Sequence, residues 1–137
     1  MKKILFAISA MVCICITSCS SNSENKASND SQLKALTEKY NAFDLNFSQE
    51  EFQQAVEVAE GLITSMEQQY KPEQLEVIKQ HPLADDPANI EAIGQDGVEM
   101  IRSINIMDNI LSCCENPDAA LQKKMEDMRA HRAKVIG

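Results

Sequence analysis

The sequence is short of the residues that most catalytic sites require. It holds two histidines, His81 and His131, and four glycines in 137 residues. No glycine-rich phosphate-binding loop, GxSxG element or HExxH element occurs in the chain. A catalytic site needs a nucleophile beside a base, a carboxylate pair in a cleft, or an open metal site. We therefore expect no enzymatic activity and assign no catalytic residue.

The sequence also lacks an apolar segment long enough to cross a membrane. Its apolar run covers residues 4–17, which is 14 residues, whereas a membrane-spanning helix needs about 20. Lys2 and Lys3 precede this run. A short positive segment followed by about 7–15 apolar residues is typical of a signal peptide. Residues 1–18 are therefore predicted to be a cleaved signal peptide that takes no part in the fold.

The three residues before Cys19 are Ile16, Thr17 and Ser18, an aliphatic residue followed by two small ones. This order resembles the lipobox of bacterial lipoproteins, and the resemblance covers residues 1–19 only. It implies a diacylglyceryl group on the Cys19 thiol, cleavage before Cys19, and acylation of the new amino group. Two or more acyl chains hold a protein stably on a bilayer. The alternative is an ordinary secretory signal, cleaved near Ser18 or Ser20.

The residue after the lipobox bears on localisation. Ser20, rather than an aspartate, follows Cys19, which resembles the lipoproteins that enteric bacteria sort to the outer membrane. The resemblance implies a lipid-anchored protein of the bacterial cell envelope, at the outer membrane, and leaves the periplasmic or surface face open. The rest of the chain shows no resemblance to a family.

Basic residues are scarce in the predicted mature chain. Without Lys2 and Lys3, 11 Lys and Arg remain against 21 Asp and Glu, a net charge of −10. This balance disfavours binding to nucleic acid, whose phosphates attract Lys and Arg, and broad adhesion to anionic lipid. The expected partners are the bilayer, through the acylated Cys19, and another protein.

Residues 20–30, SSNSENKASND, contain no large apolar side chain. Such a composition buries too little surface to offset the entropy lost on ordering. Residues 19–30 are therefore predicted to be the lipidated cysteine and a flexible tether with an r.m.s. span of about 18 Å. The folded domain is expected over residues 31–137.

From residue 31 onward the apolar residues recur with the period of a helix, and no segment shows sustained strand alternation. The first helix is predicted to place four residues on one apolar face: Leu33, Leu36, Tyr40 and Phe43.

The start of the second helix, NFSQEEF, is the best marked in the chain. Ser48 and Glu51 have the spacing of a capping box, and Phe47 and Phe52 occupy the positions of a hydrophobic staple. This predicts a helix over residues 49–70, which a short helix follows.

Two further helix starts are predicted from cap residues. Asp86 precedes Pro87, and Asn116 precedes Pro117, which we expect to be the first residue of the last helix. Between them, Gly94 and Gly97 either interrupt a buried helix or let a neighbour approach closely. The sequence therefore predicts an all-α, up-and-down bundle of four long helices and one short helix.

Two adjacent cysteines, Cys113 and Cys114, lie near the end of the long buried helix. Buried, inert thiols are the favoured interpretation. A disulfide with a partner or between the two is the alternative, although neighbours on a helix point about 100° apart. A metal or redox role is the third.

Met125, Met128 and His131 follow one another at intervals of three on the last helix. Two thioethers and an imidazole would suit Cu(I). However, both methionines also lie on the apolar stripe of this helix, so filling of the core is the favoured interpretation. No cofactor is expected other than the lipid on Cys19.

Charge is divided unevenly between two of the predicted helices. Five Glu and no Lys or Arg lie between residues 45 and 70, whereas the last helix holds Lys123, Lys124, Arg129, Arg132 and Lys134. We expect two separately solvated faces rather than a pair packed within the bundle. A partner-binding face is then predicted on the acidic helix at Glu50, Glu57 and Glu60.

The sequence thus favours a small helical protein-interaction module on a lipid anchor, with an accessory, assembly or immunity-type inhibitor role. Two alternatives are a periplasmic copper-binding protein that uses Met and Cys, and a carrier of a small apolar ligand.

Overall fold

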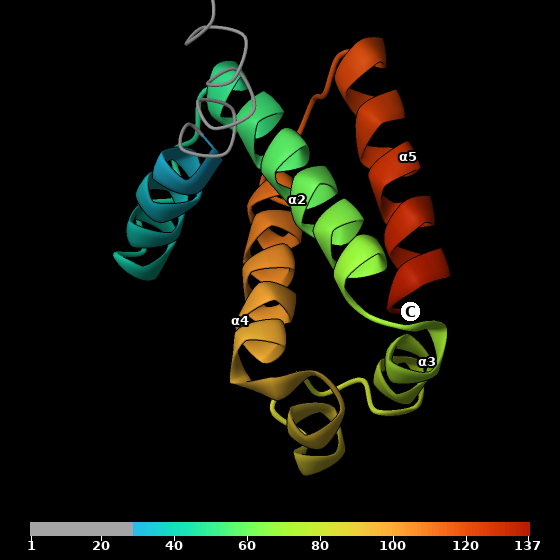
Figure 1. Cartoon of the computed structure of the whole chain (residues 1–137). Coiled ribbons are helices and arrows are strands. Elements are labelled where there is room, and N and C mark those ends of the chain that lie inside the picture. The colour runs from blue at the N-terminus through green and yellow to red at the C-terminus, as the bar shows by residue number, and fades with distance from the viewer. Residues whose placement is uncertain (1–28) are drawn as a thin grey trace, which may run out of the picture. The chain divides into compact units, whose positions relative to one another are not determined.

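The computed structural model describes residues 29–137, so the predicted signal peptide, lipobox and most of the tether lie outside the described residues. Residues 32–137 form one compact unit. Its regular elements are all helices (Figure 1), and none of them is both long and apolar enough to cross a bilayer. A helix over residues 29–41 precedes α2 (Gln49–Gln69), α3 (Pro72–Gln80), α4 (Pro87–Leu111) and α5 (Ala119–Val135). The prediction of four long helices and one short helix is confirmed.

The helix over residues 29–41 begins two residues before the predicted boundary and ends before Phe43. Leu36 is buried, and Leu33 and Tyr40 pack against the core, as predicted. The placement of Phe43 on the same face is wrong. The backbone leaves the helix after residue 41 and takes a positive φ of 59° at Phe43, which turns this side chain into solvent.

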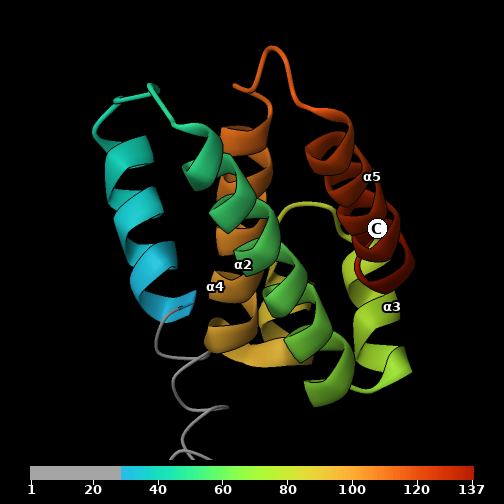
Figure 2. The same ribbon diagram turned by 90° about the horizontal axis from the view of Figure 1, so that it is seen from above.

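Helix α2 begins as its sequence predicts. The amide of Glu51 donates to Oγ of Ser48 over 3.1 Å, and the amide of Ser48 donates to Oε1 of Glu51 over 3.0 Å. The rings of Phe47 and Phe52 lie 6.0 Å apart, which completes the hydrophobic staple. Figure 2 shows the helix over residues 29–41 beside α2, with residues 42–48 joining the two at one end of the unit.

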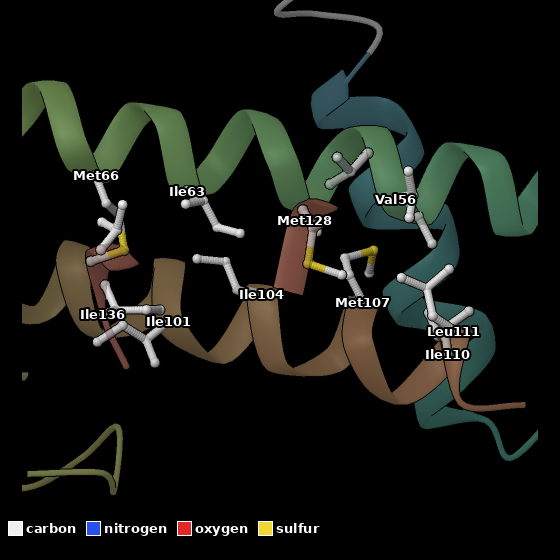
Figure 3. Close-up of a cluster of buried hydrophobic side chains, with 14 of the residues drawn as sticks. Val56, Ile63, Met66, Ile101, Ile104, Met107, Ile110, Leu111, Met128 and Ile136 are labelled. Atoms are coloured by element: carbon white, nitrogen blue, oxygen red, sulfur yellow. The ribbon is translucent and has the colours of Figure 1, made fainter. Parts of the chain in front are cut away.

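The core lies between α2 and α4, which run antiparallel, and α5 closes it from the side. Figure 3 shows Val56 near Ile110, and Ile63 of α2 facing Ile104 of α4. Met128 of α5 reaches into the same layer. Each fully buried aliphatic side chain of this kind stabilises the fold by about 1.5–3 kcal/mol.

Helix α4 is interrupted at Gly94, where φ is 75° and ψ is 175°. Of the two roles considered for this glycine, the interruption is the one observed. Before it, the fully buried Asn89 donates from Nδ2 to the carbonyl oxygens of His81 and Leu83, over 2.8 Å each. This polar core residue was not predicted, and it ties the α3–α4 connection to α4.

The predicted cap of the last helix is wrong by two residues. Asp118, not Asn116, is the N-cap of α5, and its Oδ1 accepts from the amide of Leu121 over 2.7 Å. Pro117 therefore precedes the helix. An ionised aspartate also interacts favourably with the positive end of the helix dipole, which neutral Asn116 does not.

Candidate interaction surfaces

His131 of α5 lies between two carboxylates of α2. Its Nδ1 is 2.5 Å from Oε1 of Glu60, and its Nε2 is 2.9 Å from Oε2 of Glu67. An ionised carboxylate can only accept a hydrogen bond, so both ring nitrogens must donate. The arrangement therefore fits a protonated, cationic imidazole that ties α5 to α2.

The electrostatic balance at this contact favours the charged ring. Partial burial lowers the pKa of His131, but the hydrogen bonds to Glu67 and Glu60 outweigh this and raise the pKa above its ordinary value. The hydrogen bond from His131 in turn lowers the pKa of Glu67. The two shifts thus favour the charged form of both partners.

The acidic side of α2 therefore contacts α5 through His131 and Lys124, whereas Arg129 and Arg132 of α5 pair with α4. Lys124 Nζ lies 4.0 Å from Oε1 of Glu57, one helix turn before the contact of Glu60 with His131. The expectation of two separately solvated faces is wrong, because α5 packs alongside α2. Of the predicted partner-binding residues, Glu57 and Glu60 face α5, whereas Glu50 is exposed and in no ion pair among residues 29–137.

The two cysteines lie just beyond α4 rather than on it. The helix ends at Leu111 with Ser112 as its C-cap, so the argument from neighbours on a helix does not apply to Cys113 and Cys114. Both are unbridged in the described structure and partly buried against the core, and Sγ of Cys113 lies 3.6 Å from the carbonyl oxygen of Asn109. This placement fits the interpretation as small apolar residues.

The methionines of α5 take part in the core. Met125 and Met128 are buried, and Figure 3 shows Met128 between α2 and α4, while His131 turns to its two carboxylates. Within residues 29–137, no group of three or more His, Cys, Asp or Glu is arranged to hold a metal ion. Copper binding through the thioethers stays a prediction.

A hollow of about 130 Å³ lies where α3, α4 and the end of α5 meet, lined in part by Ile78, Ile101 and Arg132. It is smaller than the roughly 300 Å³ at which ligand pockets usually begin. A larger hollow of about 480 Å³ on α3, lined by Pro72 and Val77 among others, is shallow and open to solvent. The role as a carrier of an apolar ligand also stays a prediction.

The connection between the first helix and α2, residues 42–48, has a defined conformation at its start. The amide of Phe43 donates to the carbonyl of Tyr40 over 3.0 Å, and the amide of Asp44 donates to that of Lys39 over 3.1 Å. These two bonds, with a positive φ between them, form a Schellman motif. Glycine usually occupies the position that Phe43 holds here.

Lys39 fixes the other half of this 42–48 loop. Its Nζ donates to the carbonyl of Asn46 and to both carboxylate oxygens of Glu51, at 3.1 and 3.2 Å. The same ammonium lies 4.9 Å from the ring centroid of Phe47. The loop is thus held at its start, along its length and at its end, where the capping box begins.

Four large apolar side chains remain on the surface of the described residues. Phe43 is 88% exposed, Leu83 69%, Leu45 48% and Ile90 40%. Sequence reasoning placed Phe43 on the apolar face of the first helix and did not single out Leu45 or Leu83. The motif that exposes Phe43 is normally marked by a glycine, and that signal is missing here.

Neither the family models, the curated proteins nor the solved structures contain a match to this chain.

Proposed function

We propose that the protein is a lipid-anchored envelope lipoprotein whose helical bundle binds another protein, in an accessory, assembly or immunity-type inhibitor role. The anchor is supported by the order of the N-terminal segments: two lysines, an apolar run, a lipobox ending at Cys19, and a Ser- and Asn-rich tether. This order delivers a small helical unit to a membrane surface and leaves it free to turn there.

The observation that supports the binding role most directly is a pair of exposed apolar side chains on the hydrogen-bonded loop of residues 42–48. Phe43 and Leu45 lie two residues apart, and neither contributes a buried side chain to the core. Solvated apolar groups that lie together are typical of interaction sites. A protein partner is favoured over anionic lipid because the predicted mature chain is strongly acidic.

The test is to crosslink the tagged, full-length protein in its native cells and to identify what copurifies, with Cys19→Ser as the unanchored control. We expect one dominant protein partner, reduced or lost with Cys19→Ser, and incorporation of labelled palmitate into the wild-type chain only. No partner above background in either version would contradict the binding role. Unchanged palmitate labelling in the Cys19→Ser chain would contradict the anchor.

The acidic face can be tested at Glu50 alone. Reversing Glu60 would set a lysine against His131, and reversing Glu57 would set one near Lys124, so both changes would disturb the contact between α2 and α5. Glu50→Lys leaves these contacts intact and is expected to weaken capture of the partner. Because Glu50 lies in the first turn of α2, the lost interaction with the helix dipole should lower the free energy of unfolding by no more than about 1 kcal/mol. Unchanged capture would exclude Glu50 from the binding surface.

A further inference from the structure

We infer that Phe43 is the aromatic anchor of this interaction and inserts into an apolar pocket of the partner protein that is rimmed by Lys and Arg. This inference rests on the proposed binding function and names its site and the chemistry of its partner. It follows from the conformation of Phe43, the rigidity of the loop around it, and the charges beside it.

The fold itself gives no reason for a phenylalanine at position 43. The side chain is 88% exposed, so it adds little to the core. Its φ of 59° lies in the left-handed region, which is unfavourable for a bulky residue and costs nothing for glycine. A strained, solvated aromatic residue is a reason to look for a function at that position.

Hydrogen bonds and an ion pair hold the backbone around Phe43. The Schellman bonds fix the backbone on both sides of Phe43, and Lys39 ties Asn46 and Glu51 together behind it. A side chain on a fixed backbone loses less entropy on docking than one on a mobile loop. Leu45, two residues further along the same loop, is also exposed, at 48%. Aromatic side chains that fill a partner's pocket commonly carry most of the binding energy.

The charges around the loop indicate which partner fits. Glu38, Asp44 and Glu50 are exposed and form no ion pair among residues 29–137. Lys39, which also contacts this loop, is already paired with Glu51. Three exposed carboxylates without an ion pair among the described residues thus lie within seven positions of Phe43, and a pocket rimmed by basic side chains complements them.

The same charges disfavour the two other possible occupants. An anionic bilayer would repel the acidic rim of the loop. A second copy would offer its hollow on α3, which is lined by Pro72 and Val77 but also by Glu73 and Glu76. Docking Phe43 there would bring carboxylates of like charge together, which opposes association. A basic-rimmed site on another protein avoids both conflicts.

The experiment places the photoreactive residue p-benzoylphenylalanine at position 43 of the full-length protein in its native cells. A matched chain carries it at Leu83, which is also exposed. We expect a discrete protein adduct from position 43 that is about ten times stronger than any from position 83. Since charge steers the contact, Asp44→Lys with Glu50→Lys should weaken the adduct several-fold, and so should raising the salt in isolated membranes from about 0.1 to 0.5 M. Mapping should place the crosslink beside Lys or Arg of the partner.

A second set of variants separates the effect of Phe43 on partner binding from its effect on stability. With the photoreactive residue at Leu45, both Phe43→Ala and Phe43→Gly should reduce the adduct about tenfold. Phe43→Gly should nevertheless have a Tm several degrees above that of Phe43→Ala, because only glycine removes the left-handed strain. A full-strength adduct from Leu45 in either variant would overturn the inference.

The remaining outcomes each have one meaning. A lipid adduct or a crosslink to a second copy from position 43 would replace the basic partner with that occupant and overturn the inference. A protein adduct from position 83, or a dominant copurifying partner, without one from position 43 would overturn the inference and leave the proposed function standing. No protein adduct from either position and no copurifying partner would overturn both.

Discussion

The Nε2 atom of His131 lies 2.9 Å from Oε2 of Glu67, although the two residues are 64 positions apart in the sequence. Glu60 occupies the other nitrogen of the same ring, so the imidazole bridges two carboxylates of α2 from its place on α5. Helix α5, like α2, has a side-chain N-cap. Its apolar face is narrow, with Leu121, Met125, Met128 and Val135 as its buried residues. An ionic tie of this kind helps to set how α5 lies along α2.

This contact should make stability depend on pH through His131. Because the folded-state pKa of His131 is raised, the contribution is full below the ordinary pKa of 6.5 and is lost as pH rises through the higher folded value. His131→Gln should lower the free energy of unfolding by about 1 kcal/mol at about pH 6, a value discounted because both carboxylates are partly solvated. The difference between wild type and variant should shrink towards about pH 9.

Denaturant unfolding of both proteins across this pH range measures the effect, and subtracting the two curves cancels the titrating groups that do not contact His131. The lowered pKa of Glu67 sets the low-pH limit of the effect. Its contribution to stability is present above the ordinary pKa of 4.5 and is lost as pH falls through the lower pKa of the folded state. A difference that stays constant from about pH 6 to 9 would contradict the ionic tie.

The parts of this fold that the sequence predicts are those set by local interactions. The capping box of Ser48 and Glu51 and the staple of Phe47 and Phe52 each join residues within six positions, so their spacing alone identifies the start of α2. The apolar face of the first helix follows for the same reason, because the helical period relates Leu33, Leu36 and Tyr40.

The parts that escape prediction depend on packing between distant segments. Nothing in the period of α2 or α5 indicates that Glu60 and Glu67 will meet His131, because that contact depends on how the two helices are placed. Buried Asn89 is likewise explained only by two carbonyl groups of the preceding loop. Phe43 was misplaced because a Schellman turn without its usual glycine looks like one more turn of helix.

The corrected start of α5 can be tested with two single substitutions. Asp118→Ala removes the oxygen that accepts from the amide of Leu121 and should destabilise the protein by about 1 kcal/mol. Asn116→Ala, two residues earlier, removes an exposed side chain outside the helix and should change stability by less than about 0.5 kcal/mol. Chemical denaturation of both variants is the measurement. A larger loss of unfolding free energy for Asn116→Ala than for Asp118→Ala would show that Asn116, the residue predicted from sequence, is the N-cap.

The interruption of α4 gives a prediction about backbone strain. At Gly94, φ of 75° with ψ of 175° is a conformation that is essentially restricted to glycine. A methyl group there would meet no described atom within 4 Å, so any loss in Gly94→Ala comes from the backbone and not from a clash. We expect a loss of about 1–3 kcal/mol in the free energy of unfolding. Gln95→Ala, at the next exposed position, serves as the control and should be nearly neutral. A neutral Gly94→Ala would mean that α4 runs straight through this residue.

Asp108 should contribute more to stability than an ordinary surface carboxylate, because it joins α4 to α5. Its two oxygens accept from Nε of Arg129 at 2.9 Å and from Arg132 at 3.3 Å, and its side chain is only 25% exposed. Asp108→Asn keeps the shape but removes the charge, leaving two guanidinium groups without their shared counterion. We expect a loss of about 1–2 kcal/mol in the free energy of unfolding.

The matched control is Asp127→Asn, which breaks the contact with Lys123 on the exposed side of α5. That pair has an N–O distance of 3.0 Å but is 66–75% exposed, and pairs of this type within one helix contribute only about 0.3–0.5 kcal/mol. Salt should reduce the small effect at Asp127 more completely than the effect at Asp108, since solvated charges are the more strongly screened. Equal losses at the two positions would mean that Asp108 acts as a solvated surface charge, and that apolar packing alone holds α5 against α4.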